Sequence, residues 1–187
     1  MLVRSAQWPQ DADRLLTLDT TFVTDRIYVP VQEGLSFRLV EQCVDPPLRK
    51  RYPFDPVDLD ERQQWDYSII AEENGVLAGF AAAQFMAWNR RVTVHHLYVM
   101  PAFRRQGVGK QLLDALDTYA SSVNAHCLWV ETQNVNAPAI AFYQRAGFEF
   151  CGLDTSLYDP ENVGAEEIAV FFSRPVGLPL TTRGHKL

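Results

Sequence analysis

The alternation of apolar and polar positions in the middle of the chain predicts a run of strands. Residues 67–73, 76–88 and 91–100 each follow a strand pattern. Asn74-Gly75 separates the first two segments, and a type I′ turn needs positive φ at both of its central positions, which these residue types tolerate. Asn89-Arg90 is placed to make the next tight turn. The pattern therefore predicts an antiparallel meander.

After the meander the apolar spacing changes to that of helices. Residues 111–122 carry leucines at helical spacing, and 127–130 form a short apolar run typical of a buried strand. Asn136 is a suitable N-cap for a second helix, with Pro138 in its first turn. Gly147 suits the left-handed position that ends such a helix. The two closing strands are expected at 148–152 and 168–172.

The first third of the chain has weaker signals. Residues 11–19 have the pattern of a short amphipathic helix, and 36–44 alternate like a strand. Four prolines within 45–61 argue against a continuous helix or a central strand, so we expect a surface loop there. Residues 175–187 are expected to be a loosely ordered tail. The order of elements predicts an α+β domain whose sheet has mixed strand direction.

Composition narrows the class of protein. The chain has 187 residues, 47% hydrophobic and 21% charged, which predicts one globular domain spanning 1–187. The net charge of −6 argues against a nucleic-acid partner and favours cationic ones. Three scattered cysteines without a CxxC pair indicate neither a disulfide framework nor a zinc site. Without an apolar run of membrane-spanning length or a signal peptide, we expect a cytoplasmic protein with no membrane partner and no metal.

The segment 97–109, LYVMPAFRRQGVG, has the features of an anion-binding loop. Its glycines let the backbone approach phosphates closely, and the N–H groups that open the following helix point at an anion. Arg104 and Arg105 add positive charge. The segment lacks the Gly-Lys-Ser/Thr of a Walker loop, and Leu112 stands where a dinucleotide fingerprint has its third glycine. The alternative is an ordinary Gly-rich turn with two exposed arginines.

Two motifs together resemble the GNAT superfamily of N-acetyltransferases, over residues 67–151. The first is the acetyl-CoA signature R/Q-x-x-G-x-G/A, and the second is N-x-x-A-x-x-x-Y-x-x-x-G-F. The resemblance implies an acetyl-CoA co-substrate and a mixed, mostly antiparallel sheet flanked by helices. The matching residues are Arg104, Gly107 and Gly109 in the first motif and Asn136, Ala139, Tyr143, Gly147 and Phe148 in the second.

Segments outside these motifs resemble the streptothricin (nourseothricin) acetyltransferases within that superfamily: 45–48, 87–91, 134–140 and 151–159. That resemblance implies transfer of an acetyl group to the β-lysine moiety of a polycationic antibiotic, which confers resistance. Other acceptors stay open, namely an aminoglycoside, a polyamine, or a protein lysine or N-terminus. A non-catalytic acyl-CoA sensor is a further alternative. Many GNAT proteins form homodimers, but the sequence identifies no interface.

The resemblance also assigns catalytic roles. Tyr143 is expected to donate a proton to the CoA sulfur, although its spacing also fits a core tyrosine. A lysine-like amine has a pKa of about 10.4, so a base must remove its proton. The family usually carries acids where this chain has His95-His96, and adjacent strand residues face opposite sides, so at most one of the two faces the substrate. His95, His96 and Glu131 are the candidates for the base, each with an ordinary structural alternative.

The remaining site residues are expected partly from this resemblance and partly from their own chemistry. Among the acceptor ligands, the resemblance itself supports only Asp154 and Tyr158, and each of the others has an ordinary structural alternative. A backbone N–H at Tyr98 or Val99 is expected to polarise the thioester carbonyl. The acceptor is expected to meet acidic groups and an aromatic wall, at Trp88, Glu131, Asp154, Tyr158 and Asp159. The residues expected to bind acetyl-CoA are Leu97, Tyr98, Val99, Arg104, Arg105, Gln106, Gly107, Val108, Gly109, Lys110, Asn136 and Tyr143.

Overall fold

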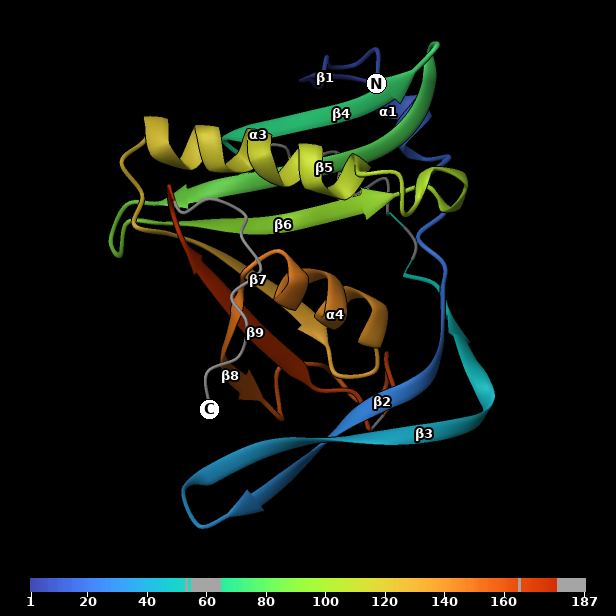
Figure 1. Ribbon diagram of the computed structural model, residues 1–187, viewed down its shortest axis with the longest axis vertical. Coiled ribbons are helices and arrows are strands. Elements are labelled where there is room, and N and C mark those ends of the chain that lie inside the picture. Colours follow the sequence, from blue (N-terminus) through green and yellow to red (C-terminus); the bar gives the residue numbers. More distant parts are fainter. Residues whose placement is uncertain (53, 55–64, 165, 178–187) are drawn as a thin grey trace. The chain divides into compact units, whose positions relative to one another are not determined.

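The computed structural model describes residues 1–52, 54, 65–164 and 166–177 (Figure 1). Helices and strands alternate along the second half of the chain, after a first half made almost entirely of strands. In chain order the elements are β1 (Leu2–Ser5), α1 (Ala12–Leu15), β2 (Phe22–Glu33), β3 (Ser36–Lys50), β4 (Tyr67–Glu73), β5 (Val76–Met86), β6 (Arg91–Val99), the 3₁₀ turn η2 (Pro101–Phe103), α3 (Val108–Ser122), β7 (Cys127–Gln133), α4 (Ala137–Arg145), β8 (Glu149–Asp154) and β9 (Ala169–Pro175).

Seven of these strands form one sheet in the order β1-β4-β5-β6-β7-β9-β8, and β2 and β3 form a separate two-stranded sheet. Neighbours in the larger sheet pair antiparallel from β1 to β6, as do β8 and β9, whereas β6 and β7 run parallel. The sheet is therefore mixed and mostly antiparallel, and the predicted α+β class is confirmed.

Contacts divide the described chain into two compact units. The first contains Met1–Thr21, Arg51–Val130 and the end of β9 from Arg174. The second contains Phe22–Lys50 and the segment from Glu131 to Ser173, so β7 and β9 contribute residues to both. That the whole chain is one domain stays a prediction.

The first unit is the predicted meander with a helix on it, and α3 lies along β5 and β6 (Figure 1). Asn74 and Gly75 have φ of 51° and 78°, which confirms the tight turn between β4 and β5. The turn between β5 and β6 covers residues 87–90, whereas the sequence predicted a turn of only two residues, Asn89-Arg90. A Cβ on Gly79 would lie 2.7 Å from the Tyr98 carbonyl oxygen, so β5 keeps a glycine where the backbone packs closely.

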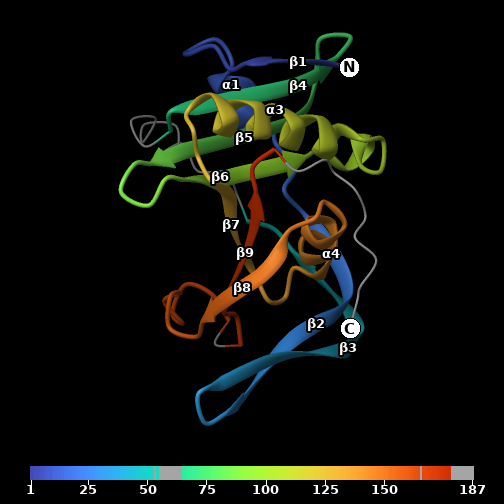
Figure 2. The same cartoon turned by 60° about the vertical axis from the view of Figure 1, so that its left-hand side comes forward.

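The second unit is organised by a buried asparagine, Asn134, at the end of β7. Its Nδ2 donates to the carbonyl oxygens of Tyr28 and Glu166, at 2.8 and 3.1 Å, and its Oδ1 accepts from the Ile168 N–H at 2.8 Å. These bonds join β2 to the turn after β7 and to the residues that enter β9. Figure 2 shows β8 beside β9, where the two pair antiparallel.

The sequence missed or misplaced several elements. No strand was predicted at β1 or β2, and α1 covers only four residues of the expected 11–19. The expectation of a loop from residue 45 is wrong as far as Lys50, because β3 continues to that residue. The prolines fit because they lie where the register shifts: Cys43 pairs with Arg26 and Leu48 with Thr24, so Pro46 and Pro47 sit in an interruption of the ladder.

The remaining differences concern strand and segment ends. β8 and β9 each extend past the predicted closing strands. Residues 53 and 55–61 of the predicted loop lie outside the described residues, and so do residues 178–187 of the predicted tail. Pro175, assigned to that tail from the sequence, is the last residue of β9.

An ion-pair cluster around Asp11 fixes the N-terminal part of the first unit. Asp11 is 2% exposed and accepts two hydrogen bonds from Arg4, at 2.7 and 3.0 Å, and one from Arg14 at 3.0 Å. Both arginines also pair with Glu72 of β4. The Arg4 hydrogen bond lowers the pKa of Asp11 to about 2, against the opposing effect of burial. The cluster therefore ties β1 and α1 to β4.

We expect Asp11→Asn to lower the free energy of unfolding by about 2 kcal/mol at pH 7. A carboxyl group with a lowered pKa stabilises the fold above its ordinary pKa, and that stabilisation is lost as pH falls toward 2. Urea unfolding should therefore show a smaller difference between variant and wild type at pH 3 than at pH 7. Asp13→Asn, at an exposed position of the same helix, is the matched control. An equal loss in both variants would contradict the structural role of Asp11.

Candidate active site

The predicted anion-binding loop joins β6 to α3 in the first unit. Gly107 is the N-cap of α3 with φ of 83°, and Arg105 also has positive φ, 62°. A Cβ on Gly107 would meet no atom within 4 Å, so backbone conformation rather than space favours glycine there. The first intrahelical bond runs from the Gln111 N–H to the Gly107 carbonyl, which leaves the preceding N–H groups of the helix open to an anion.

Arg104 is fixed by the loop itself. Its Nε donates to the Val99 carbonyl oxygen at 3.0 Å, which ties the loop to the end of β6. Burial lowers the pKa of this guanidinium and the charge of Asp19 opposes that effect, but an arginine keeps its proton at neutral pH. Arg105 is exposed, and Lys110 is engaged by Asp114 at 2.7 Å. Among the predicted basic ligands, Arg104 is therefore the one that a hydrogen bond to the backbone holds in position.

Strand β6 carries a β-bulge at His95. Val94 pairs with Ala83 and His96 with Ala82, so His95 is an extra residue opposite β5. Val94 and His96 therefore pair with adjacent residues of β5, and they face opposite sides of the sheet. The simple alternation expected from the sequence does not hold across His95. The pairing of β6 with β7 ends at Val94, immediately before the bulge. Leu97, Tyr98 and Val99 follow the bulge and pair with β5.

The two histidines have different environments. His96 lies among aromatic rings, with ring centroids 5.1 Å from Phe54 and 5.0 Å from Trp65. Burial lowers the pKa of His96 to about 4, and its Nδ1 has no hydrogen-bond partner among the described residues. His95 is exposed, although partial desolvation lowers its pKa against the opposing charge of Asp66. Both rings are therefore neutral at pH 7, and His95 is the more accessible base.

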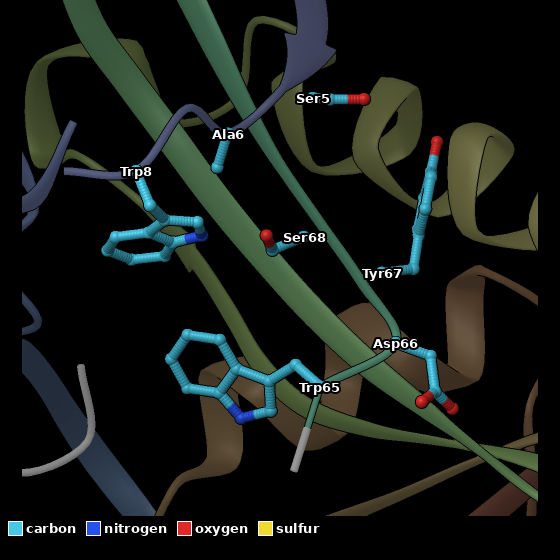
Figure 3. Close-up of a pocket in the computed structure, with 7 residues that line it drawn as sticks. All are labelled: Ser5, Ala6, Trp8, Trp65, Asp66, Tyr67 and Ser68. Atoms are coloured by element: carbon cyan, nitrogen blue, oxygen red, sulfur yellow. The ribbon is translucent and has the colours of Figure 1, made fainter. Parts of the chain in front are cut away.

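A cavity of about 310 Å³ opens beside the start of β4 (Figure 3). Trp65 takes part in both this cavity and the ring cluster around His96. Asp66 accepts a hydrogen bond from the Phe85 N–H at 2.6 Å. None of the residues predicted for the site lines this cavity, and no sequence motif marks those that do: Ser5, Ala6, Trp8, Trp65, Asp66, Tyr67 and Ser68.

Trp88, predicted as an aromatic wall for the acceptor, lies in the turn between β5 and β6 and is 79% exposed. This turn is at the opposite end of β6 from the anion-binding loop. Its role in substrate binding stays a prediction.

Helix α4, in the second unit, has the predicted caps. The Asn136 side chain accepts a hydrogen bond from the Ala139 N–H at 3.2 Å, and Gly147 has φ of 83°. Tyr143 is 6% exposed, and its ring centroid lies 5.5 Å from that of Phe148 and 5.4 Å from that of Phe142. The ring of Tyr143 is therefore held by packing, and the side chain of Asn136 has a structural task in addition to any contact with CoA.

Two of the four predicted acceptor-binding residues of the second unit contact each other. The Tyr158 hydroxyl donates to Glu131 Oε1 at 2.7 Å. Asp154 accepts from the N–H and the hydroxyl of Ser156, and Asp159 accepts from the Glu161 N–H. The structure thus brings Glu131 and Tyr158 together, whereas Asp154 and Asp159 hold turns of their own loop.

The described part of the chain shows neither a group of possible metal ligands nor a membrane-spanning helix. Its His, Cys, Asp and Glu side chains form no group of three that could hold a metal ion. Cys43, Cys127 and Cys151 form no disulfide with one another or with the rest of the described chain. Within the same residues, no helix is long and apolar enough to cross a membrane. The expectations of no metal and of a cytoplasmic location stay predictions.

The loop at the start of α3 and the Asn-capped helix that carries Tyr143 hold the two sequence motifs of an acetyltransferase class. The chain belongs to the acetyltransferase (GNAT) family, whose model matches residues 37–148. It is an N-acetyltransferase that uses acetyl-CoA as co-substrate.

Individual proteins and crystal structures resemble this chain over nearly its full length. The chain is 39% identical to the streptothricin acetyltransferase of Streptomyces lavendulae over 179 residues, which cover 92% of this chain and 93% of that protein. A crystal structure of nourseothricin acetyltransferase superposes with a TM-score of 0.83 at 39% identity, over 94% of this chain and 98% of the other. A putative streptothricin acetyltransferase from Bacillus anthracis, in complex with acetyl coenzyme A, shares the fold at 23% identity, with a TM-score of 0.77 over 93% of this chain and 98% of that one.

We expect Arg104→Ala to weaken acetyl-CoA binding by about tenfold, because a charge-assisted contact to phosphate and the tie to Val99 are both lost. Isothermal titration with CoA measures the effect. Arg38→Ala removes the same charge from an exposed position of β3 and should leave the affinity unchanged. Unaltered affinity in the Arg104 variant would count against the assignment of this loop.

Proposed function

We propose that the protein acetylates an amino group on the β-lysine moiety of streptothricin-type antibiotics and thereby inactivates them. The observation that carries this proposal is the 39% identity to a streptothricin acetyltransferase over nearly the full length of both chains. Acceptor specificity lies outside the CoA loop, so a likeness restricted to the loop would not support a particular acceptor. The net charge of −6 is consistent with a polycationic substrate.

The proposed reaction forms an N–C bond to the acetyl carbonyl and breaks the C–S bond of the thioester. The N–H groups at the start of α3, together with Arg104, hold the CoA pyrophosphate. A backbone N–H near Tyr98 polarises the carbonyl. His95 removes the proton of the attacking amine, because its neutral imidazole is accessible and its lowered pKa keeps it unprotonated at pH 7. Tyr143 returns a proton to the thiolate.

The direct test mixes the purified protein with acetyl-CoA and streptothricin and follows thiol release, with mass spectrometry of the drug. A gain of one acetyl group supports the proposal. Parallel reactions with an aminoglycoside, spermidine and a peptide N-terminus test the other amines. Turnover of one of those, with streptothricin inert, would overturn the antibiotic assignment while keeping the acetyltransferase. Tight CoA binding without turnover of any amine would favour a sensor.

We expect Tyr143→Phe to lower kcat by about a hundredfold, the typical contribution of general acid catalysis. The phenyl ring preserves the packing against Phe148, so the affinity for acetyl-CoA and the unfolding temperature should stay near those of the wild type. Steady-state kinetics and titration with CoA separate these effects. If turnover is unchanged, Tyr143 is not the proton donor.

A further inference from the structure

The hydrogen bond between Tyr158 and Glu131 connects the segment after β8 to strand β7. It spans 27 residues of sequence, is partly buried, and measures 2.7 Å, the length of a good hydroxyl–carboxylate bond. Glu131 is half-buried on β7, which is regular secondary structure, whereas Tyr158 belongs to the segment between β8 and β9. A strand therefore supplies the carboxylate, and the loop supplies the group that orients it.

Three other acids of this unit have hydrogen-bond or ion-pair partners. Asp154 uses Oδ1 to hold the turn at Ser156, and Asp159 uses one oxygen for the Glu161 N–H and the other for Asn162. Glu167 is paired with Lys50. Like Asp154, Glu131 keeps one oxygen without a hydrogen bond from the described residues, but its other oxygen is held by the hydroxyl of a tyrosine 27 residues away and not by its own turn.

We propose that Tyr158 is a positioning residue that holds Glu131 by one oxygen and leaves the other to receive an ammonium group of the acceptor. The proposal rests on the acetyltransferase function proposed above and refines its acceptor site. It makes Glu131 a specificity determinant for cationic acceptors rather than the base. Asp154 and Asp159, predicted from the sequence as acceptor ligands, instead shape the loop that carries Tyr158.

Binding an ammonium group orders the carboxylate side chain, and this ordering costs conformational entropy. A free glutamate side chain loses rotamer freedom when it pairs with an ammonium group, and this loss offsets much of the attraction. A glutamate already fixed by a tyrosine loses less on binding, so the same charge pair gives a higher affinity. The effect falls on acceptor binding and leaves both the CoA loop and the acetyl transfer step unchanged.

The experiment is a double-mutant cycle on streptothricin acetylation, with Tyr158→Phe, Glu131→Gln and the double variant. Tyr158→Phe should raise KM for streptothricin about threefold to tenfold and Glu131→Gln about tenfold or more, with kcat and KM for acetyl-CoA near wild-type values. The double variant should be no worse than Glu131→Gln alone, because Tyr158 acts through Glu131.

The chain contains a matched control, because the Tyr28 hydroxyl donates to Glu41 at 3.2 Å on the exposed β2–β3 sheet. Tyr28→Phe removes the same atoms and the same kind of bond, and should leave KM unchanged. Thermal unfolding of all variants separates a general loss of stability from a specific one. Additive effects in the cycle, or an equal rise of KM in Tyr28→Phe, would overturn the positioning role. A fall in kcat at unchanged KM for Glu131→Gln would overturn the specificity role.

The results that would contradict the roles of Glu131 and Tyr158 differ from those that would contradict the proposed function. If the wild-type enzyme does not acetylate streptothricin, the antibiotic assignment itself fails, and the cycle is run on the amine that the direct test identifies. If the wild type acetylates streptothricin and Glu131→Gln matches it in every constant, only the assignment of Glu131 and Tyr158 falls.

Discussion

The site in the first unit depends on how strand β6 is paired. β6 pairs with β5 on both sides of His95, from Arg91 to Val99, but its pairing with the parallel strand β7 ends at Val94. The bulge at His95 begins where that pairing stops. A bulge leaves one residue out of the ladder and turns the strand locally, so backbone groups beyond it are available for a ligand while β5 still keeps the strand in place. The anion-binding loop follows directly, with Arg104 tied to the last carbonyl of β6.

The acidic residues of this chain have different structural roles, which the net charge alone does not reveal. Asp11 is buried and holds two arginines that join β1 and α1 to β4. Asp154 and Asp159 cap turns in the segment after β8. Glu131 is oriented by a tyrosine and keeps one oxygen without a hydrogen bond to the described residues. Negative charge therefore supports the fold at several positions, and under our proposal Glu131 is the counter-ion of a cationic acceptor.

The environments of His95 and His96 distinguish these two residues as candidates for the catalytic base. The sequence left three candidate side chains for the base, His95, His96 and Glu131. Burial among aromatic rings lowers the pKa of His96 to about 4, so this ring is a weak base at neutral pH. His95 is exposed at the bulge and is chemically suited to accept a proton near neutral pH.

The sequence by itself determined the features that depend on one residue and its near neighbours. Gly107 and Gly147 with positive φ, the Asn136 cap and the Asn74-Gly75 turn are local, and the structure contains each of them. Because the GNAT motifs are built from such local features, the class of enzyme was also predictable.

The tertiary structure decided everything that depends on contacts between distant residues. Strand β2, the continuation of β3 through its prolines, the bulge at His95 and the bond from Tyr158 to Glu131 each depend on a partner many residues away. A proline in a sequence predicts a break, but whether it breaks a strand depends on the register of the partner strand. A tyrosine next to acids predicts nothing about which carboxylate it orients, because that choice is made by the packing of the loop.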